Sequence, residues 1–91
     1  MDYKKSTNRI WMEDKDGKEI AFVSFPAVDK GVVTITSTVV DPSLRGQGVA
    51  GDLMETLAKE LRDSNRKAIP ICSYAIKWFS DHPEQGDLLD I

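Results

Sequence analysis

The sequence predicts a single domain of the mixed α/β (α+β) class, in which an antiparallel meander precedes a strand–helix–strand unit and a short C-terminal helix. Three observations predict this class. Residues 9–40 fall into short apolar or β-branched runs with turn signals between them. Apolar residues over 50–61 recur at the 3.6-residue spacing of a helix. A second short apolar run follows at 67–72, and a strand, a crossover helix and a strand favour a right-handed parallel pair.

The composition is that of an ordinary soluble globular domain, expected to span residues 1–91, with 41% hydrophobic and 30% charged residues. A net charge of −3 argues against a nucleic-acid partner. No apolar run is long enough to span a membrane and no signal peptide is present, so we expect no membrane partner and a cytoplasmic location. The single cysteine, Cys72, excludes an internal disulfide and a thiolate-based zinc site, and no metal is expected.

The first forty residues predict the meander. Residues 9–14 alternate loosely and form a strand, and Asp16-Gly17 supplies a hairpin turn suited to positive φ. Residues 19–25 form a second strand, which Pro26 ends or places at a sheet edge. Residues 32–40 are nearly all β-branched and are expected to form one continuous strand.

The pattern then changes from strand to helix. The helix has one apolar face and one charged face, and Asn65 is suited to a left-handed stop after it. Residues 67–72 form the last predicted strand. A short helix follows, with Ile76 and Phe79 directed inward, and then an irregular tail. The apolar face of the first helix consists of Ala50, Leu53, Met54, Leu57, Ala58 and Leu61.

A G-x-G-x-x-G sequence at residues 46–51 lies between a strand and a helix, as in a dinucleotide-binding turn. In a Rossmann fold the first glycine follows the strand directly, whereas residues 41–45 separate Val40 from Gly46 here. The acidic residue that would hold the ribose is also missing, because the next strand ends in Cys72-Ser73. No Gly-Lys-Ser/Thr follows the glycines, which excludes a Walker P-loop as well.

The same glycines still fit a phosphate bound by the backbone. A helix that begins near Gly46–Gly48 presents unpaired N–H groups and the positive end of its dipole. Glycines lack Cβ and let a pyrophosphate approach these amides, and Arg45 adds a cation. The alternative is a glycine-rich strand-to-helix turn that binds no ligand.

Residues 45–50, R-G-Q-G-V-A, resemble the Q/R-x-x-G-x-G/A signature of the GNAT N-acetyltransferases. The longer segments V-D-P-S-L-R-G-Q-G-V-A-G, A-I-P-I-C-S-Y and H-P-E resemble the short, single-domain GNAT-like acetyltransferases. The resemblance covers about residues 9–85. It implies a GNAT-like mixed sheet with a splayed parallel strand pair, and acetyl-coenzyme A as cofactor.

The resemblance also implies where the coenzyme lies. It would enter the gap between strands 32–40 and 67–72, with its pantetheine arm paired to the backbone near Val39 and Val40. Positively charged residues are candidates for the adenosine-side phosphate, or else solvated surface residues: Lys4, Lys5, Arg66 and Lys67. The pyrophosphate would contact the amides of Arg45, Gly46, Gln47, Gly48, Val49 and Ala50.

Three residues are candidates for catalysis by the same resemblance. Tyr74 lies near the position of the tyrosine that protonates the departing thiolate, and its alternative is a packed aromatic residue. Cys72 lies at the mouth of the gap and either accepts the acetyl group, which requires a reactive thiolate, or is a buried small hydrophobe. His82 would activate Cys72 or the acceptor amine, or would cap the last helix in solvent.

The implied function is acetyl transfer from coenzyme A to an unidentified acceptor, a small-molecule or protein amine. Two departures concern the acceptor side: the Asp16-Gly17 turn replaces the helices between the first two strands of longer members, and only about twenty residues follow Cys72. A coenzyme A-binding module with little or no transferase activity is therefore the alternative, followed by an interaction domain. The sequence does not indicate the oligomeric state.

Overall fold

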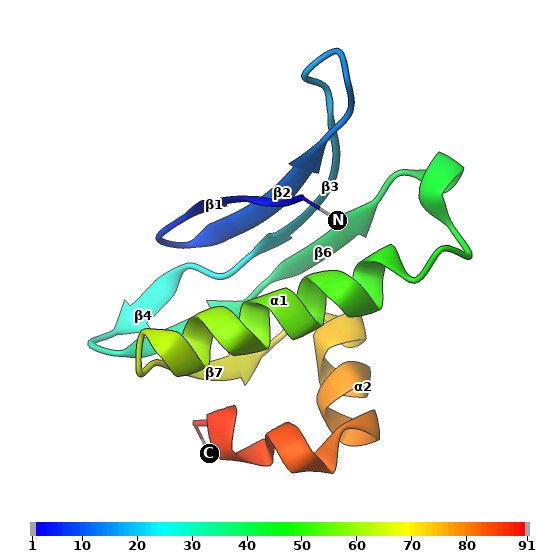
Figure 1. Cartoon of the computed structure of the whole chain (residues 1–91). Helices are drawn as coiled ribbons and strands as arrows, with labels where there is room; N and C mark the ends of the chain where they lie inside the picture. Colours follow the sequence, from blue (N-terminus) through cyan, green and yellow to red (C-terminus); the bar gives the residue numbers. More distant parts are fainter. Residues whose placement is uncertain (1, 91) are drawn as a thin grey trace.

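A computed structural model describes residues 2–90 and has two small sheets packed against a long helix, with a shorter helix beside them (Figure 1). One sheet has the strand order β1-β2-β3-β6 and the other has the order β4-β5-β7. The elements in chain order are β1 (Lys4–Ser6), β2 (Arg9–Glu13), β3 (Glu19–Ser24), β4 (Ala27–Asp29), β5 (Val32–Ile35), β6 (Ser37–Val40), the 3-10 turn η1 (Pro42–Leu44), α1 (Val49–Asp63), β7 (Lys67–Pro70), α2 (Ser73–Asp81) and the 3-10 segment η2 (Pro83–Leu88).

The predicted meander is confirmed. β2 pairs antiparallel with β3, with Trp11 opposite Phe22, and the connecting turn contains Gly17 at a φ of 81°. Two strands were not predicted: β4, which pairs antiparallel with β5, and β1, which pairs antiparallel with β2 at the sheet edge, with Lys5 opposite Ile10. The β1 sequence Lys-Lys-Ser has neither β-branched residues nor alternation, and lysines are common on edge strands because they discourage further pairing.

The prediction of one continuous strand over residues 32–40 is wrong, because the chain changes sheets at Thr36. β5 pairs in parallel with β7, whereas β6 pairs antiparallel with β3. Thr36 N donates to Ser24 O (3.0 Å), which attaches the following residues to the first sheet. At the same place Ile35 O accepts hydrogen bonds from both Ile71 N and Cys72 N (3.0 Å each), which ends the β5–β7 ladder. The expected parallel pair is therefore confirmed over four residues and then diverges.

The core lies between the sheets and α1. The predicted apolar face of α1 is buried except at Ala50, which is half-buried near the helix start. The helix ends as expected, since Asn65 follows the C-cap Ser64 with a φ of 58°. The largest fully buried side chains are those of Phe25, Ile10, Ile35, Leu53, Met54, Leu57, Leu61, Val23 and Val33.

The C-terminal part departs from prediction in two ways. α2 buries Ala75, Trp78 and Phe79, whereas Ile76 is 51% exposed, so the prediction for Phe79 is confirmed and that for Ile76 is wrong. The tail is not irregular throughout: η2 buries Leu88, and Asp90 N donates to Ala68 O (2.9 Å) beside β7.

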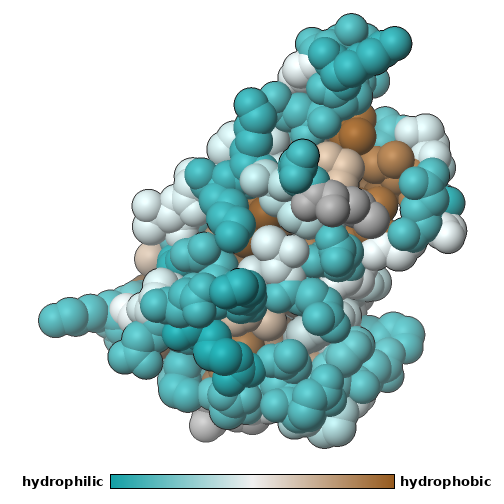
Figure 2. Space-filling model, in the orientation of Figure 1, coloured by the Kyte–Doolittle hydropathy of each residue, from teal (hydrophilic) through white to brown (hydrophobic). Residues whose placement is uncertain are grey.

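The face shown in Figure 2 has one apolar region and one hydrophilic region. Apolar surface gathers between the β2–β3 hairpin and the η1 segment, whereas the surface over α1 and η2 is largely hydrophilic. Within residues 2–90 no helix is long and apolar enough to cross a bilayer.

Candidate active site

The site begins at the open edge of β6. This strand is the last in its sheet, and β7 belongs to the other sheet, so backbone groups on one side of β6 have no strand partner among the described residues. Asp41 N donates to Ile20 O (2.8 Å), and Val39 lies opposite Phe22. Because antiparallel backbone groups alternate in direction, the backbone of Val39 faces β3 and that of Val40 faces the open edge.

Between β6 and α1 the chain makes a series of tight turns. The Asp41 carboxylate accepts a hydrogen bond from Ser43 N (2.9 Å), and this bond holds the pKa of Asp41 below its usual range. Gly46 and Gly48 have φ values of 82° and 74°, a left-handed conformation that glycine adopts at little cost. Gly48 is the N-cap of α1 and makes no side-chain capping bond, so the first amides of the helix remain available to an anion.

A pocket of about 360 Å³ lies at this helix start, and we refer to it as the coenzyme pocket, after the ligand that the sequence resemblance leads us to expect there. Six of the eight residues expected to bind the coenzyme line it. Val39 and Gln47 do not: the Val39 side chain is 48% exposed on the sheet, and Gln47 N donates back to Leu44 O (3.3 Å). The pocket is lined by Thr38, Val40, Leu44, Arg45, Gly46, Gly48, Val49, Ala50, Gly51 and Tyr74.

The charge of the pocket rim favours an anion. Arg45 is exposed, and no carboxylate within residues 2–90 pairs with it. A guanidinium without a partner beside uncapped helix amides is well suited to phosphate oxygens. The residues present therefore fit the pyrophosphate of a coenzyme.

Cys72 follows β7 and contacts β6 across the gap between the two strands. It is the N-cap of α2, where its Sγ accepts a hydrogen bond from Ala75 N (3.4 Å). The same sulfur lies 3.6 Å from Thr38 Oγ1, on β6 across the gap. Thr38 was not among the predicted site residues, and its place two residues before Val40 on the same face of the strand was the signal that pointed to it.

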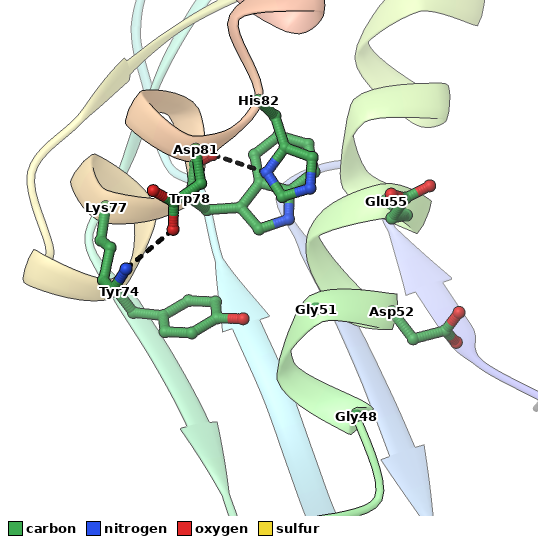
Figure 3. A pocket seen from close by; sticks show the side chains of 9 residues that line it. All are labelled: Gly48, Gly51, Asp52, Glu55, Tyr74, Lys77, Trp78, Asp81 and His82. Atoms are coloured by element: carbon green, nitrogen blue, oxygen red, sulfur yellow. Dashed lines mark hydrogen bonds and ion pairs between the residues drawn. The ribbon is translucent and has the colours of Figure 1, made fainter.

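Tyr74 lies in the first turn of α2 and points toward α1 (Figure 3). Its hydroxyl lies 3.7 Å from the position that a Cβ at Gly51 would take. Burial raises the pKa of Tyr74, and the nearby Lys77 partly offsets this effect. The phenol is therefore protonated at neutral pH and can donate a proton.

His82 lies at the opposite end of α2 from Cys72. Its ring stacks on Trp78 (centroids 4.3 Å apart, interplanar angle 19°), and its Nδ1 lies 2.8 Å from Trp78 O. The nine residues of α2 rise about 14 Å between its two ends, so the structure does not bring His82 to Cys72.

A second pocket, of about 470 Å³, lies between α1 and α2, and we call it the α1–α2 groove (Figure 3). It shares Gly48, Gly51 and Tyr74 with the coenzyme pocket, so the two spaces adjoin. Its lining residues are Gly48, Gly51, Asp52, Glu55, Tyr74, Lys77, Trp78, Asp81 and His82.

The cations considered for the adenosine-side phosphate do not line either pocket. Lys5 and Arg66 pair with Glu60 (3.7 and 3.6 Å), about 17 Å along α1 from its start, and Lys67 Nζ binds a backbone oxygen of the tail. Lys4 pairs with a carboxylate on β2 (3.2 Å). Among the described residues no group of three or more His, Cys, Asp or Glu side chains could hold a metal ion.

Comparisons with known proteins identify the family to which this fold and pocket belong. A family model described as GCN5-related N-acetyl-transferase matches residues 9–88. Comparison with curated proteins finds no match. Among solved structures, a GCN5-like protein from Staphylococcus aureus has a TM-score of 0.80 and 26% identity, over 98% of this chain and 87% of that one.

Two enzymes from Escherichia coli share the fold at lower identity. A GNAT family N-acetyltransferase in complex with CoA has a TM-score of 0.65 and 23% identity, over 78% of this chain and 43% of that one. The ribosomal-protein-S18-alanine N-acetyltransferase has a TM-score of 0.64 and 23% identity, over 87% of this chain and 50% of that one. The chain thus spans about half the length of these two enzymes. Because the family model covers nearly the whole chain, this protein belongs to the GCN5-related N-acetyltransferase (GNAT) family of acetyl-coenzyme A-dependent acetyltransferases.

Proposed function

We propose that this protein binds acetyl-coenzyme A in the coenzyme pocket and transfers the acetyl group to the amine of an acceptor molecule. The observation that carries the proposal is the uncapped start of α1 at Gly48, which opens into a pocket along the free edge of β6. The amides from Gly48 onward and the Arg45 guanidinium bind the pyrophosphate. The backbone of Val40 on the open edge pairs with the amide groups of the pantetheine arm.

The coenzyme supplies an activated thioester, whose carbonyl carbon an amine attacks while the carbon–sulfur bond breaks. The chain contributes positioning and proton transfer. Tyr74 gives its hydroxyl proton to the departing thiolate and later regains one from solvent. The amine releases its proton to solvent, because His82 lies at the opposite end of α2 from Cys72 and the thioester, where its Nδ1–H donates to Trp78 O.

Cys72 offers a second route to the same product. Its sulfur lies beside Thr38 across the gap. With the pyrophosphate at Gly48, the thioester end of the coenzyme would lie near this sulfur. In this route the Cys72 thiol becomes acetylated and its proton passes to the thiol of the coenzyme. The acceptor amine then takes the acetyl group from Cys72 and restores the thiol. The free cysteine also fits a reducing compartment, and we place the protein in the cytoplasm.

A pair of glycine variants tests the coenzyme pocket. Gly48 and Gly31 have nearly the same φ (74° and 73°), and a Cβ at either meets no atom within 4 Å. Alanine at either position should therefore cost a similar ~1 kcal/mol of stability. Only Gly48→Ala places its methyl beside the proposed pyrophosphate, so calorimetry should show at least about tenfold weaker coenzyme A binding for it alone. Equal affinities for the two variants would refute the pocket assignment.

Mass spectrometry tests the transfer itself. The wild type and Cys72→Ala are incubated with acetyl-coenzyme A and weighed under native and denaturing conditions. A covalent acetyl mass that requires Cys72 supports the two-step route, and a native adduct without covalent transfer supports direct attack. A native adduct with no release of coenzyme thiol in the presence of any amine tested would identify a coenzyme A-binding module instead.

A further inference from the structure

The coenzyme pocket ends against a packed part of the core. Thr38 lines the pocket on β6, and Gly51 lines it in the first turn of α1. Met54 lies one turn further along the same helix and is only 1% exposed. Its Sδ lies 4.0 Å from the Thr38 Oγ1. The Met54 side chain therefore closes the space between β6 and α1 behind Thr38.

The acyl group of a bound thioester would lie close to this contact. The Thr38 Oγ1 is also 3.6 Å from the Cys72 Sγ, near which the proposed function places the thioester. The sulfur atoms of Cys72 and Met54 thus both lie within 4.0 Å of one hydroxyl oxygen. A longer acyl chain would soon meet Met54, and a close-packed core accepts added methylene groups only at a cost in free energy.

The α1–α2 groove is the other space that an acyl chain could enter, because Tyr74 lines both the groove and the coenzyme pocket. The lining of the groove includes the charged side chains of Glu55, Lys77 and Asp81, and the last two form an ion pair (2.8 Å). A hydrocarbon chain in the groove would displace water from these charged groups, which costs free energy. We therefore expect the chain to extend toward Met54.

From this geometry we propose that Met54 determines the length of the acyl group that the protein accepts from the coenzyme. A methionine side chain is unbranched and adaptable, so propanoyl should be tolerated and butanoyl should be rejected. Met54 takes no part in the transfer itself and acts only as the wall that the acyl chain meets. The inference rests on the proposed function, because it concerns the acyl end of the bound coenzyme.

Calorimetry with coenzyme A, acetyl-coenzyme A and butanoyl-coenzyme A tests the assignment. The wild type should bind the butanoyl form at least about tenfold more weakly than the acetyl form, the lower limit for one misfitting methylene group in an apolar site. Met54→Ala should raise the relative affinity for the butanoyl form at least about tenfold, because the longer chain fills the cavity. Leu57→Ala is the matched control: it truncates another fully buried residue of α1, one turn further from the pocket, and should leave the ratio unchanged. Met54→Val and Leu57→Val form a milder pair if the alanine variants do not fold.

The outcomes separate this inference from the proposed function. A wild type that binds the acetyl and butanoyl forms equally would overturn the inference, because the chain would then have another path, such as the α1–α2 groove. An unchanged ratio in the Met54 variant would overturn it as well, and so would an equal rise in the Leu57 variant, which would assign the effect to a loosened core. In all three cases the coenzyme pocket stands. Absence of binding of all three coenzymes to the wild type would instead refute the proposed function.

Discussion

Gly51 is a helical glycine whose replacement should separate stability from function. It occupies the third position of α1, where a glycine weakens a helix because it loses more backbone freedom on folding than alanine does. A Cβ at this position would meet only the Tyr74 hydroxyl, at 3.7 Å, which is an ordinary van der Waals contact. Gly51→Ala should therefore be accepted without any repacking of the core.

The expected gain follows from helix propensity alone. Alanine is about 0.8–1 kcal/mol better than glycine in a helix interior and somewhat less so in the first turn, so we expect a stabilisation of about 0.5–1 kcal/mol. For a domain of this size, 1 kcal/mol corresponds to roughly 4–8 °C in Tm. The added methyl group also borders both pockets and restricts Tyr74, so coenzyme A binding should weaken several-fold.

Thermal unfolding followed by circular dichroism measures the first effect, and calorimetry with coenzyme A measures the second. Gly86→Ala is the control for affinity, because its methyl enters open space away from both pockets. A Gly51→Ala variant that melts below the wild type would show that Tyr74 cannot tolerate the methyl group. Unchanged coenzyme affinity in a stabilised variant would refute the argument that a methyl group at Gly51 restricts Tyr74 beside the coenzyme pocket.

Two further predictions concern stability. Leu57→Ala, at a fully buried position of α1, should destabilise the protein by about 2–5 kcal/mol in urea unfolding, and a loss below 1 kcal/mol would contradict the assigned core. Stability should also fall as the pH rises above the ordinary tyrosine pKa of about 10, because burial raises the pKa of both Tyr3 and Tyr74 in the folded state, and the hydrogen bond to Asp52 raises that of Tyr3 further. Melting curves between pH 8 and 11 should show a smaller loss for Tyr3→Phe, and an equal loss would assign the alkaline effect elsewhere.

The part of the proposed site that backbone groups form could be predicted from the sequence. The conformations of Gly46 and Gly48 and the start of α1 depend on local sequence, so the glycine spacing could predict the tight turn and the helix start at the proposed coenzyme pocket. The groove was not predictable in this way. It depends on how α2 packs beside α1, which brings Glu55 and Trp78 to the same pocket from positions far apart in the chain.

The sequence by itself determined the order and type of the main elements. The period of the apolar residues specified the β2–β3 meander and the buried face of α1, because local spacing decides which side of a strand or helix can face a core. Only the tertiary structure decided where the run of residues 32–40 divides. Every residue in that run suits a strand, and the break at Thr36 depends on which sheet offers the next hydrogen bond: Ser24 on one side, and Ile71 with Cys72 on the other. The gap at the centre of the proposed site exists because of that division. Local residue spacing cannot predict it, because it depends on hydrogen bonds between strands that lie far apart in the chain.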